Sequence, residues 1–393
     1  MGSVTFAAGE RFLGRTSMDT SAAISRRILL QGGAAAAVAS FLAGCSPGRS
    51  ATTEAGKLRI GYSNSVIGNS WRGQFVANIE AKGDAMKASN IIADLRVVNS
   101  SNDITQQISQ LNNFLTADLD VVLIDPVSAG SVQAIIPRLK AAGALVIVST
   151  DPAPTEDALN VVGDNYTWWK MQTTWLVEQL GGQGKIVMVT GVPGSTADVQ
   201  RIKAAQEVLN TAPGIEVVAS VPGFWDPARA RTAMANVLAT QTQIDGVLMQ
   251  DVMTEGVIRA FQSSGRPLPR VMTGDYTAGF LRAWSALPDL VSIGVPYSPT
   301  YGADSMEFAV RLVSGRTLKD SSISPNPERE DLRNAVLLFP SLAITRDGSR
   351  GAWTPEGTEV ISLEEALKRV DGKPDSYTLE APMSPEQIED YFA

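Results

Sequence analysis

Short all-apolar runs alternate along this chain with longer segments in which apolar residues recur every three or four positions. The first run, Leu58 to Tyr62, is followed by Phe75, Ile79 and Met86 at helical spacing. Other runs, such as Val121 to Ile124, contain no polar residue at all, which is typical of parallel strands buried on both faces. Because this alternation continues through most of the chain, it predicts an α/β fold of parallel sheets with helices on both faces.

Polar or acidic residues follow these strand patterns. Trp71 and Arg72 come after the first strand, and Asn69 or Ser70 is a candidate N-cap of the next helix. Four later strands end at aspartates, which are Asp125, Asp151, Asp251 and Asp275. An isolated aspartate after a strand is by default a helix cap. Four of them at equivalent junctions favour a shared site, because ligands bind at the carboxyl ends of strands in open α/β sheets.

Composition excludes several classes of chemistry. The chain has 393 residues, 44% apolar side chains and a net charge of −8. It can therefore bury two sizeable domains, and it lacks the basic footprint that nucleic-acid binding requires. The absence of histidine excludes Ser-His-Asp catalysis and His-ligated metal sites. A single cysteine excludes an intrachain disulfide. We therefore expect no enzymatic activity, no cofactor, no metal and no nucleic-acid partner.

An export signal precedes the first strand pattern. Arg26 and Arg27 stand before an uncharged stretch, Ile28 to Gly44, which is short and diluted by glycine and alanine and so is a weak candidate for a membrane span. The arginine pair favours the twin-arginine route. The stretch ends Leu-Ala-Gly-Cys, which resembles the bacterial lipobox, so we expect Cys45 to be lipidated. Translation from Met18 would give a signal of more usual length.

The two halves of the strand–helix region read as two versions of one architecture. Crossings between them are expected near Gly163 and after Val295, and the last strand is expected at Ala335 to Phe339. The C-terminal part is rich in Gly, Pro and Glu, so we expect it to wrap on the surface, with partial disorder as an open alternative. The expected segments are 1–44 (export signal with lipobox), 45–57 (tether), 58–163 with 297–340 (N-terminal lobe), 164–296 (C-terminal lobe) and 341–393 (C-terminal extension).

The polar strand ends resemble those of the periplasmic sugar-binding proteins of ABC transporters, in the type I, ribose-binding-protein-like group. The family's motif after the first strand, an Asn-Pro followed by two aromatics, corresponds here to Asn69-Ser70-Trp71-Arg72. The Trp-Arg pair is similar to the branch that binds galactofuranose and other simple sugars. Asp151, Arg201, Gln250-Asp251 and Gly274-Asp275 fit as well. The resemblance covers roughly residues 58–340.

Three departures from the ribose-type pattern leave the identity of the sugar open. Pro152 stands after Asp151 where ribose binders have arginine, Asp251 replaces an expected asparagine, and Arg72 replaces the second aromatic.

The resemblance implies two Rossmann-like lobes with parallel sheets, joined by a hinge, that close over a monosaccharide or polyol. It further implies a monomer that delivers its ligand to an ABC permease and ATPase. With Cys45 lipidated, we expect this monomer to be anchored by lipid at the periplasmic or cell surface. Trp71 and Trp225 would flank the sugar ring, Asp151 and Asp275 would accept from its hydroxyls, and Arg201 would donate. The full set of candidate ligand-binding residues is Ser65, Asn69, Trp71, Arg72, Asp125, Asp151, Arg201, Trp225, Asp251 and Asp275.

The sequence leaves four alternative functions open. The excess of acids beside two tryptophans would suit a cationic amine, although the arginines oppose it. A sensory receptor that presents its ligand to a membrane kinase has the same sequence features. An enzyme of this fold class would need a phosphate loop or dinucleotide fingerprint, and none is present. A lac-repressor-type regulator would need a helix-turn-helix before residue 58.

Overall fold

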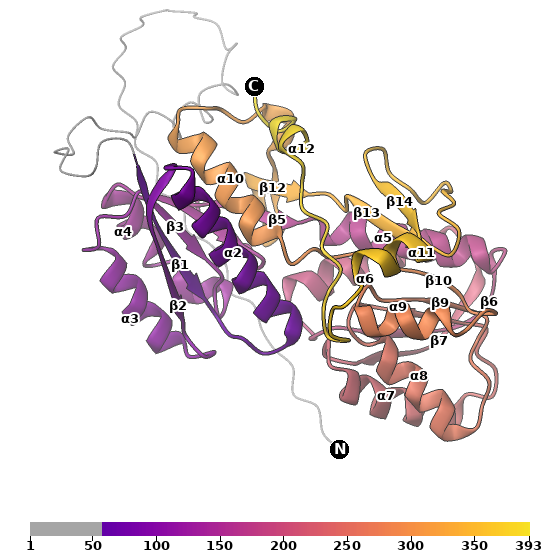
Figure 1. Ribbon diagram of the computed structural model, residues 1–393. Helices are drawn as coiled ribbons and strands as arrows, with labels where there is room; N and C mark the ends of the chain where they lie inside the picture. Colours follow the sequence, from indigo (N-terminus) through magenta and orange to yellow (C-terminus); the bar gives the residue numbers. More distant parts are fainter. Residues whose placement is uncertain (1–56) are drawn as a thin grey trace, which may run out of the picture. The chain divides into compact units, whose positions relative to one another are not determined.

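The computed structural model describes residues 57–393 (Figure 1). The expected export signal, Cys45 and all but the last residue of the tether lie outside this part. Two parallel sheets carry the fold. The first has seven strands in the order β11-β12-β5-β4-β3-β1-β2, parallel except for the β11–β12 pair. Its strands are β1 (Leu58–Asn64), β2 (Ile92–Asn99), β3 (Val121–Ile124), β4 (Leu145–Ser149), β5 (Leu159–Gly163), β11 (Ser324–Asn326) and β12 (Arg329–Leu338).

The second sheet has five parallel strands in the order β10-β9-β8-β6-β7. They are β6 (Gln183–Thr190), β7 (Gly214–Pro222), β8 (Gly246–Met249), β9 (Val271–Thr273) and β10 (Val291–Ile293). Both sheets thus repeat one doubly wound order, in which the first strand lies between the second and the third. The order reverses between β1 and β3 and again between β6 and β8. Such switch points are where open α/β sheets bind ligands, and the predicted fold class of two parallel-sheet lobes is confirmed.

The helices begin where the sequence supplies side-chain caps. Asn69 caps α2 by accepting from the main-chain N–H of Arg72 at 2.9 Å, and Asp226 caps α7 in the same way, with Pro227 at its first position. Both caps agree with the sequence pattern. The helices are α2 (Ser70–Ala88), α3 (Ile104–Phe114), α4 (Ile136–Ala141), α5 (Asn165–Gln179), α6 (Thr196–Asn210), α7 (Pro227–Thr240), α8 (Thr254–Ser264), α9 (Ala278–Ser285), α10 (Tyr301–Val313), α11 (Leu363–Arg369) and α12 (Pro385–Glu389), with 3-10 turns at Ala129–Val132 and Asp320–Ser322.

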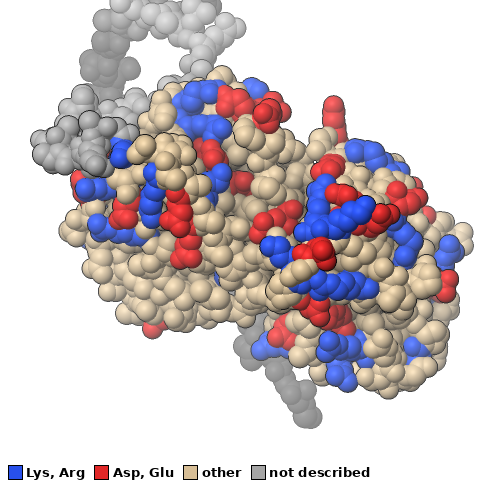
Figure 2. Space-filling model, in the orientation of Figure 1, with Lys and Arg blue, Asp and Glu red and all other residues tan. Residues whose placement is uncertain are grey.

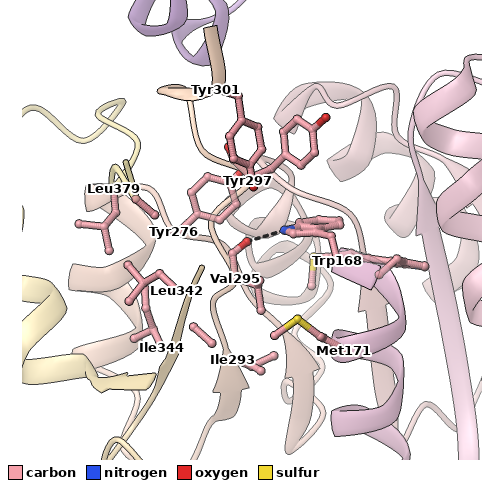
Figure 3. Close-up of a cluster of buried hydrophobic side chains, with 14 of the residues drawn as sticks. Trp168, Met171, Tyr276, Ile293, Val295, Tyr297, Tyr301, Leu342, Ile344 and Leu379 are labelled. Atoms are coloured by element: carbon pink, nitrogen blue, oxygen red, sulfur yellow. Dashed lines mark hydrogen bonds between the residues drawn. The ribbon is translucent and has the colours of Figure 1, made fainter. Parts of the chain in front are cut away.

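An aromatic cluster fills the region where the chain passes between the two sheets (Figure 3). The chain leaves the first sheet after Gly163 and returns after β10 through Tyr297. A Cβ on Gly163 would overlap the Tyr297 ring, so glycine is needed there for the two connections to approach each other. Trp168 stands edge-on to Tyr297 and donates its indole N–H to the carbonyl of Val295 at 2.8 Å. These contacts fix the start of α5 against the returning chain.

The C-terminal segment is an integral part of the fold, and the expectation of a surface-wrapped, partly disordered extension is wrong. It forms a parallel pair, β13 (Leu342–Thr345) with β14 (Glu359–Ser362), followed by α11 and α12, so β12 is not the last strand. Leu342, Ile344 and Leu379 are buried in the aromatic cluster of Figure 3. The elements are too short to show periodicity, and they complete apolar surfaces supplied by distant parts of the chain.

The C-terminal segment spans both sheets. In Figure 1, α11 lies beside α9 of the second lobe and α12 beside α10 of the first, as their packing contacts require. Between them, the main-chain N–H of Ala278 donates to the carbonyl of Tyr377 at 2.8 Å, and that of Leu379 donates to the carbonyl of Tyr276 at 2.9 Å. Gln74 of α2 bonds the main chain of Thr378. Residues 377–380 therefore tie α2 to α9.

Within residues 57–393, no helix is long and apolar enough to cross a bilayer, and no three Cys, Asp or Glu side chains are grouped as metal ligands would be. Figure 2 shows Lys and Arg side chains interspersed with Asp and Glu on the face in view.

Candidate ligand-binding site

The first lobe holds a buried ion pair at its switch point. Arg72 lies in the first turn of α2 and Asp125 directly follows β3, with Nη1 of Arg72 2.6 Å from Oδ2 of Asp125. Asp125 is fully buried and Arg72 is partly exposed. Tyr62 donates its hydroxyl to Oδ2 at 2.5 Å, and Thr150 donates to Oδ1 at 2.6 Å. Both carboxylate oxygens of Asp125 therefore already have protein donors.

The second lobe repeats this arrangement on equivalent elements. Arg201 lies in α6, the helix after the first strand of its sheet, and Asp251 closely follows β8, the third strand. Nη1 of Arg201 lies 2.8 Å from Oδ1 of Asp251, and Tyr276 donates its hydroxyl to Oδ2 at 2.7 Å. The Nε of Arg201 donates to Asn165 at 2.9 Å. Each lobe thus contains one arginine held by an aspartate that a tyrosine hydroxyl braces, which is how buried charges are kept in proteins.

Asp151 and Asp275 differ from these paired aspartates. Neither forms an ion pair in the described part of the chain. Burial raises the pKa of Asp151 to about 6, while the charges of Arg72 and Arg201 act in the opposite direction. Burial likewise raises the pKa of Asp275 to about 8, although this carboxylate accepts the main-chain N–H of Tyr276 at 2.7 Å. Near neutral pH these two carboxyls can donate as well as accept hydrogen bonds.

The two lobes meet around Tyr297 on the returning chain. Its ring centre lies 5.8 Å from that of Trp71 in the first lobe and 5.0 Å from the guanidinium carbon of Arg201 in the second. The charges of Arg72 and Arg201 both oppose the rise in the pKa of Asp151. Beyond this point the lobes also touch through polar contacts, in which Thr196 donates to Glu328 and Gln200 donates to the carbonyl of Pro327 at 3.4 Å. The two switch points therefore face each other.

Two partly exposed tryptophans lie beside the ion pairs. Trp71 precedes Arg72 and donates its indole N–H to the carbonyl of Tyr297 at 2.7 Å, so its ring is held by the returning chain. Trp225 donates to Oε1 of Gln250 at 2.8 Å, and its ring centre lies 5.6 Å from the guanidinium of Arg201. The indole N–H of each tryptophan is already hydrogen-bonded to the protein, so a ligand would contact the face of the ring.

Three other tryptophans are buried. Trp168, Trp175 and Trp284 are 1%, 3% and 0% exposed. Trp168 also stacks under Arg201, whose guanidinium carbon lies 4.2 Å from its ring centre. A core side chain therefore also supports a charged group of the site.

Two of the candidate residues from the sequence have local roles. Asn69 is exposed and its side chain caps α2. Ser65 is buried, and its carbonyl accepts from the Ser100 hydroxyl and the main-chain N–H of Asn102, both at 2.8 Å. The side-chain contacts join Arg72 to Asp125 in the first lobe and Arg201 to Asp251 in the second, with Trp71 beside Arg72 and Trp225 beside Arg201. Asp151 and Asp275 each follow the neighbouring strand of the sheet, β4 and β9.

Several residues that build the site were not singled out from the sequence. Tyr62 reads as an apolar member of β1, yet its hydroxyl reaches Asp125. Asn165, Thr150 and Tyr276 lie at junctions whose polar character was visible, but their partners are far away in the chain. The sequence indicates only that these residues lie near strand ends. It contains no signal for which of them form hydrogen bonds with one another.

Four non-glycine residues in the loops of the site adopt positive φ angles. They are Thr150, Phe224, Trp225 and Val252, with φ of 70°, 61°, 53° and 56°. This conformation is costly for β-branched residues such as Thr150 and Val252. Trp225 is itself a candidate ligand-binding residue, and the other three each adjoin one. Such local strain is typical of sites in which side-chain direction matters.

Residues 60–317 match the family described as periplasmic binding protein domain. Since the match covers more than half of the chain, and the fold and site agree with it, the chain belongs to this family of extracytoplasmic solute receptors. Such proteins bind their solute without transforming it, so the chain is not an enzyme.

Individual relatives are similar over most of the folded region. A putative rhizopine-binding protein of Rhizobium meliloti is 28% identical over 58% of this chain and 76% of its own length. The galactofuranose-binding protein YtfQ of Escherichia coli is 23% identical over 74% and 90% of the two chains. A solute-binding protein from Thermobispora bispora has the same fold, with a TM-score of 0.66 at 23% identity over 85% of this chain and 94% of that one.

Proposed function

We propose that this chain is an exported solute-binding protein that captures a neutral sugar or polyol and delivers it to an ABC importer. The observation that carries the proposal is the facing pair of switch points, each with a braced arginine and a fixed indole ring. Asp151 and Asp275 supply hydrogen-bonding carboxyls between them. A ligand with hydroxyls on its edge and C–H groups on its faces suits this combination. The two arginines and the two acids can bond the hydroxyls, and the two indole faces can contact the C–H groups.

The relatives support this class of ligand. One is a xylitol-binding protein from Mycolicibacterium smegmatis, 30% identical over 46% of this chain and 52% of its own length. A structural neighbour from Bacillus halodurans contains bound myo-inositol, with a TM-score of 0.61 at 21% identity over 81% of this chain and 98% of that one. We therefore place polyols and furanoses first among the candidates.

The mechanism is a ligand-dependent closure. A sugar that bonds Asp151 of the first lobe and Asp275 of the second is bound fully only when the lobes meet. It therefore stabilises the closed state by its difference in affinity for the two states. Asp125 and Asp251 act indirectly in this scheme, because their oxygens are occupied and they hold Arg72 and Arg201 in place.

A cationic amine is the competing ligand class. The acids Asp151 and Asp275 would attract it, but Arg72 and Arg201 lie in the same site and would repel it. A thermal-shift screen of the purified protein against pentoses, hexoses, polyols and amines separates the two. A ligand at a hundred times its dissociation constant adds about 2.7 kcal/mol to the unfolding free energy. The proposal expects stabilisation by a neutral polyol or sugar, and stabilisation by amines alone would contradict it.

We also propose that Cys45 carries a lipid anchor, on the strength of the Leu-Ala-Gly-Cys sequence. Acyl chains contribute roughly 0.8 kcal/mol per buried CH₂ to membrane binding. Wild-type protein should therefore partition with membranes and Cys45→Ala should remain soluble or unprocessed. An unmodified Cys45 thiol in mature wild-type protein, detected by mass spectrometry, would refute the anchor.

A further inference from the structure

We propose that Asp198 is a positioning residue for the second lobe of the site. It fixes the side-chain amide of Gln250 so that a single oxygen, Oε1, holds both the Trp225 indole and the Arg201 guanidinium. Asp198 lies in α6 three residues before Arg201, where it is also an acid in the first turn of a helix. The inference rests on the proposed function only in that Trp225 and Arg201 face the ligand.

The orientation of Asp198 is itself fixed. Its side chain is 2% exposed, and Oδ1 accepts the main-chain N–H of Gly191 at 2.7 Å. The same oxygen accepts from Nε2 of Gln250 at 2.8 Å. Oδ1 of Asp198 acts as an acceptor in both bonds, so Gln250 must turn its NH₂ group toward Asp198.

The amide oxygen of Gln250 then points to the other side. It accepts from Nε1 of Trp225 at 2.8 Å and from Nη1 of Arg201 at 3.3 Å. Gln250 is fully buried, so water does not compete for these bonds. If the amide rotated by half a turn, its NH₂ would face two groups that can only donate, and its oxygen would face the carboxylate. Asp198 therefore selects the one orientation that holds both ligand-facing groups.

The test compares three substitutions, two at Asp198 in α6 and one at Ser195, the N-cap of this helix. Asp198→Leu removes the acceptor at similar size, and Asp198→Asn keeps an oxygen that can accept both bonds. Ser195→Ala removes the N-cap of the same helix, whose Oγ accepts from the main-chain N–H of Asp198 at 3.4 Å, and does not touch Gln250. It controls for a loss of helix stability alone.

The first readout needs no ligand. The Nε1–H resonance of Trp225 in ¹⁵N-labelled protein is assigned by its loss in Trp225→Phe. Asp198→Leu should move this resonance, whereas Asp198→Asn and Ser195→Ala should leave it in place. An unchanged resonance in folded Asp198→Leu, or an equal shift in Ser195→Ala, would overturn the proposal. If Asp198→Leu does not fold, Asp198→Ala is measured against the same two outcomes.

The second readout is affinity for xylitol, measured by calorimetry. Asp198→Leu should weaken binding by about tenfold or more, because two ligand-facing groups lose their common support, and Asp198→Asn should restore most of it. Equal affinity in Asp198→Leu and wild type would overturn the positioning role. If wild type binds no sugar or polyol, the proposed function fails, while the indole resonance still decides the role of Asp198.

Discussion

Gly191 lies directly beneath the indole of Trp225, so close that a Cβ on this glycine would overlap the ring. Its main-chain N–H also anchors Asp198. Trp225 has a positive φ of 53°, and a larger residue than glycine at position 191 would leave no room for its ring. A glycine at the end of β6 therefore sets the position of an aromatic ring in the second lobe.

Gly191→Ala should displace the Trp225 ring and weaken ligand binding by about tenfold, with little loss of stability. Overpacking at one methyl group costs about 1–3 kcal/mol, and here the displaced ring is partly exposed. Calorimetric titration checks this result. Gly130→Ala is the matched control, because a Cβ at Gly130 meets no atom within 4 Å. Wild-type affinity in Gly191→Ala would show that Trp225 does not contact the ligand.

Asp275 should make the protein less stable as the pH rises. Burial raises its pKa to about 8, far above the value near 4 of an unfolded aspartate. The folded state therefore holds the proton more tightly than the unfolded state. Its stabilising contribution is complete below about pH 4 and is lost as the pH rises through about 8. Asp151 and Asp304, with pKa values raised to about 6 and about 7, act in the same direction.

Asp275→Asn removes this titration while keeping an oxygen for the main-chain N–H of Tyr276. Urea unfolding of the ligand-free protein at pH 5, 6.5 and 8.5 should show a decline in stability for wild type and a smaller decline for Asp275→Asn. Asp103→Asn, at an exposed helix cap, should decline as wild type does. The same decline in all three proteins would contradict the raised pKa of Asp275.

Individual elements show what the sequence could predict. The apolar runs, the cap at Asn69 and the acidic strand ends followed from local patterns, because burial on both faces and capping leave local signals. The Arg72–Asp125 pair left no such signal, since its members come from separate βα units. The C-terminal elements were missed for the same reason, as they are stabilised by residues far away along the chain.

Gln74 shows how strongly the C-terminal segment is held. Its Nε2 donates to the carbonyl of Thr378 at 2.8 Å, and its Oε1 accepts the main-chain N–H of Thr378 at 2.9 Å. Gln74→Leu would leave the main-chain N–H and carbonyl of Thr378, a fully buried residue, without these hydrogen-bond partners. We expect it to lower the unfolding free energy by about 2 kcal/mol or more, as measured by urea denaturation.

Thr378→Val is the control for this substitution. The Thr378 hydroxyl is buried and has no hydrogen-bond partner among residues 57–393, so its removal should cost nothing or increase stability. Equal stability of Gln74→Leu and wild type would show that the C-terminal segment does not depend on α2.

The two lobes of the molecule bind one ligand together in the proposed function. The repeated strand order gives each lobe a switch point, and each switch point carries an arginine, an aspartate and a nearby tryptophan. The unpaired acids are divided between the lobes, with Asp151 in the first and Asp275 in the second. A ligand that bonds both of these acids therefore stabilises the closed state of the two lobes.

Calorimetric titration of Asp151→Ala and Asp275→Ala with the sugar or polyol found in the thermal-shift screen tests this claim most directly. A hydrogen bond contributes about 0.5–1.5 kcal/mol, or about 1.5–3 kcal/mol when one of its groups is charged, so each variant should bind roughly threefold to a hundredfold more weakly while remaining folded. Asp103→Ala, which removes a helix cap at a strand end outside the site, should bind as wild type does. Wild-type affinity in both Asp151→Ala and Asp275→Ala would contradict a site shared by the two lobes.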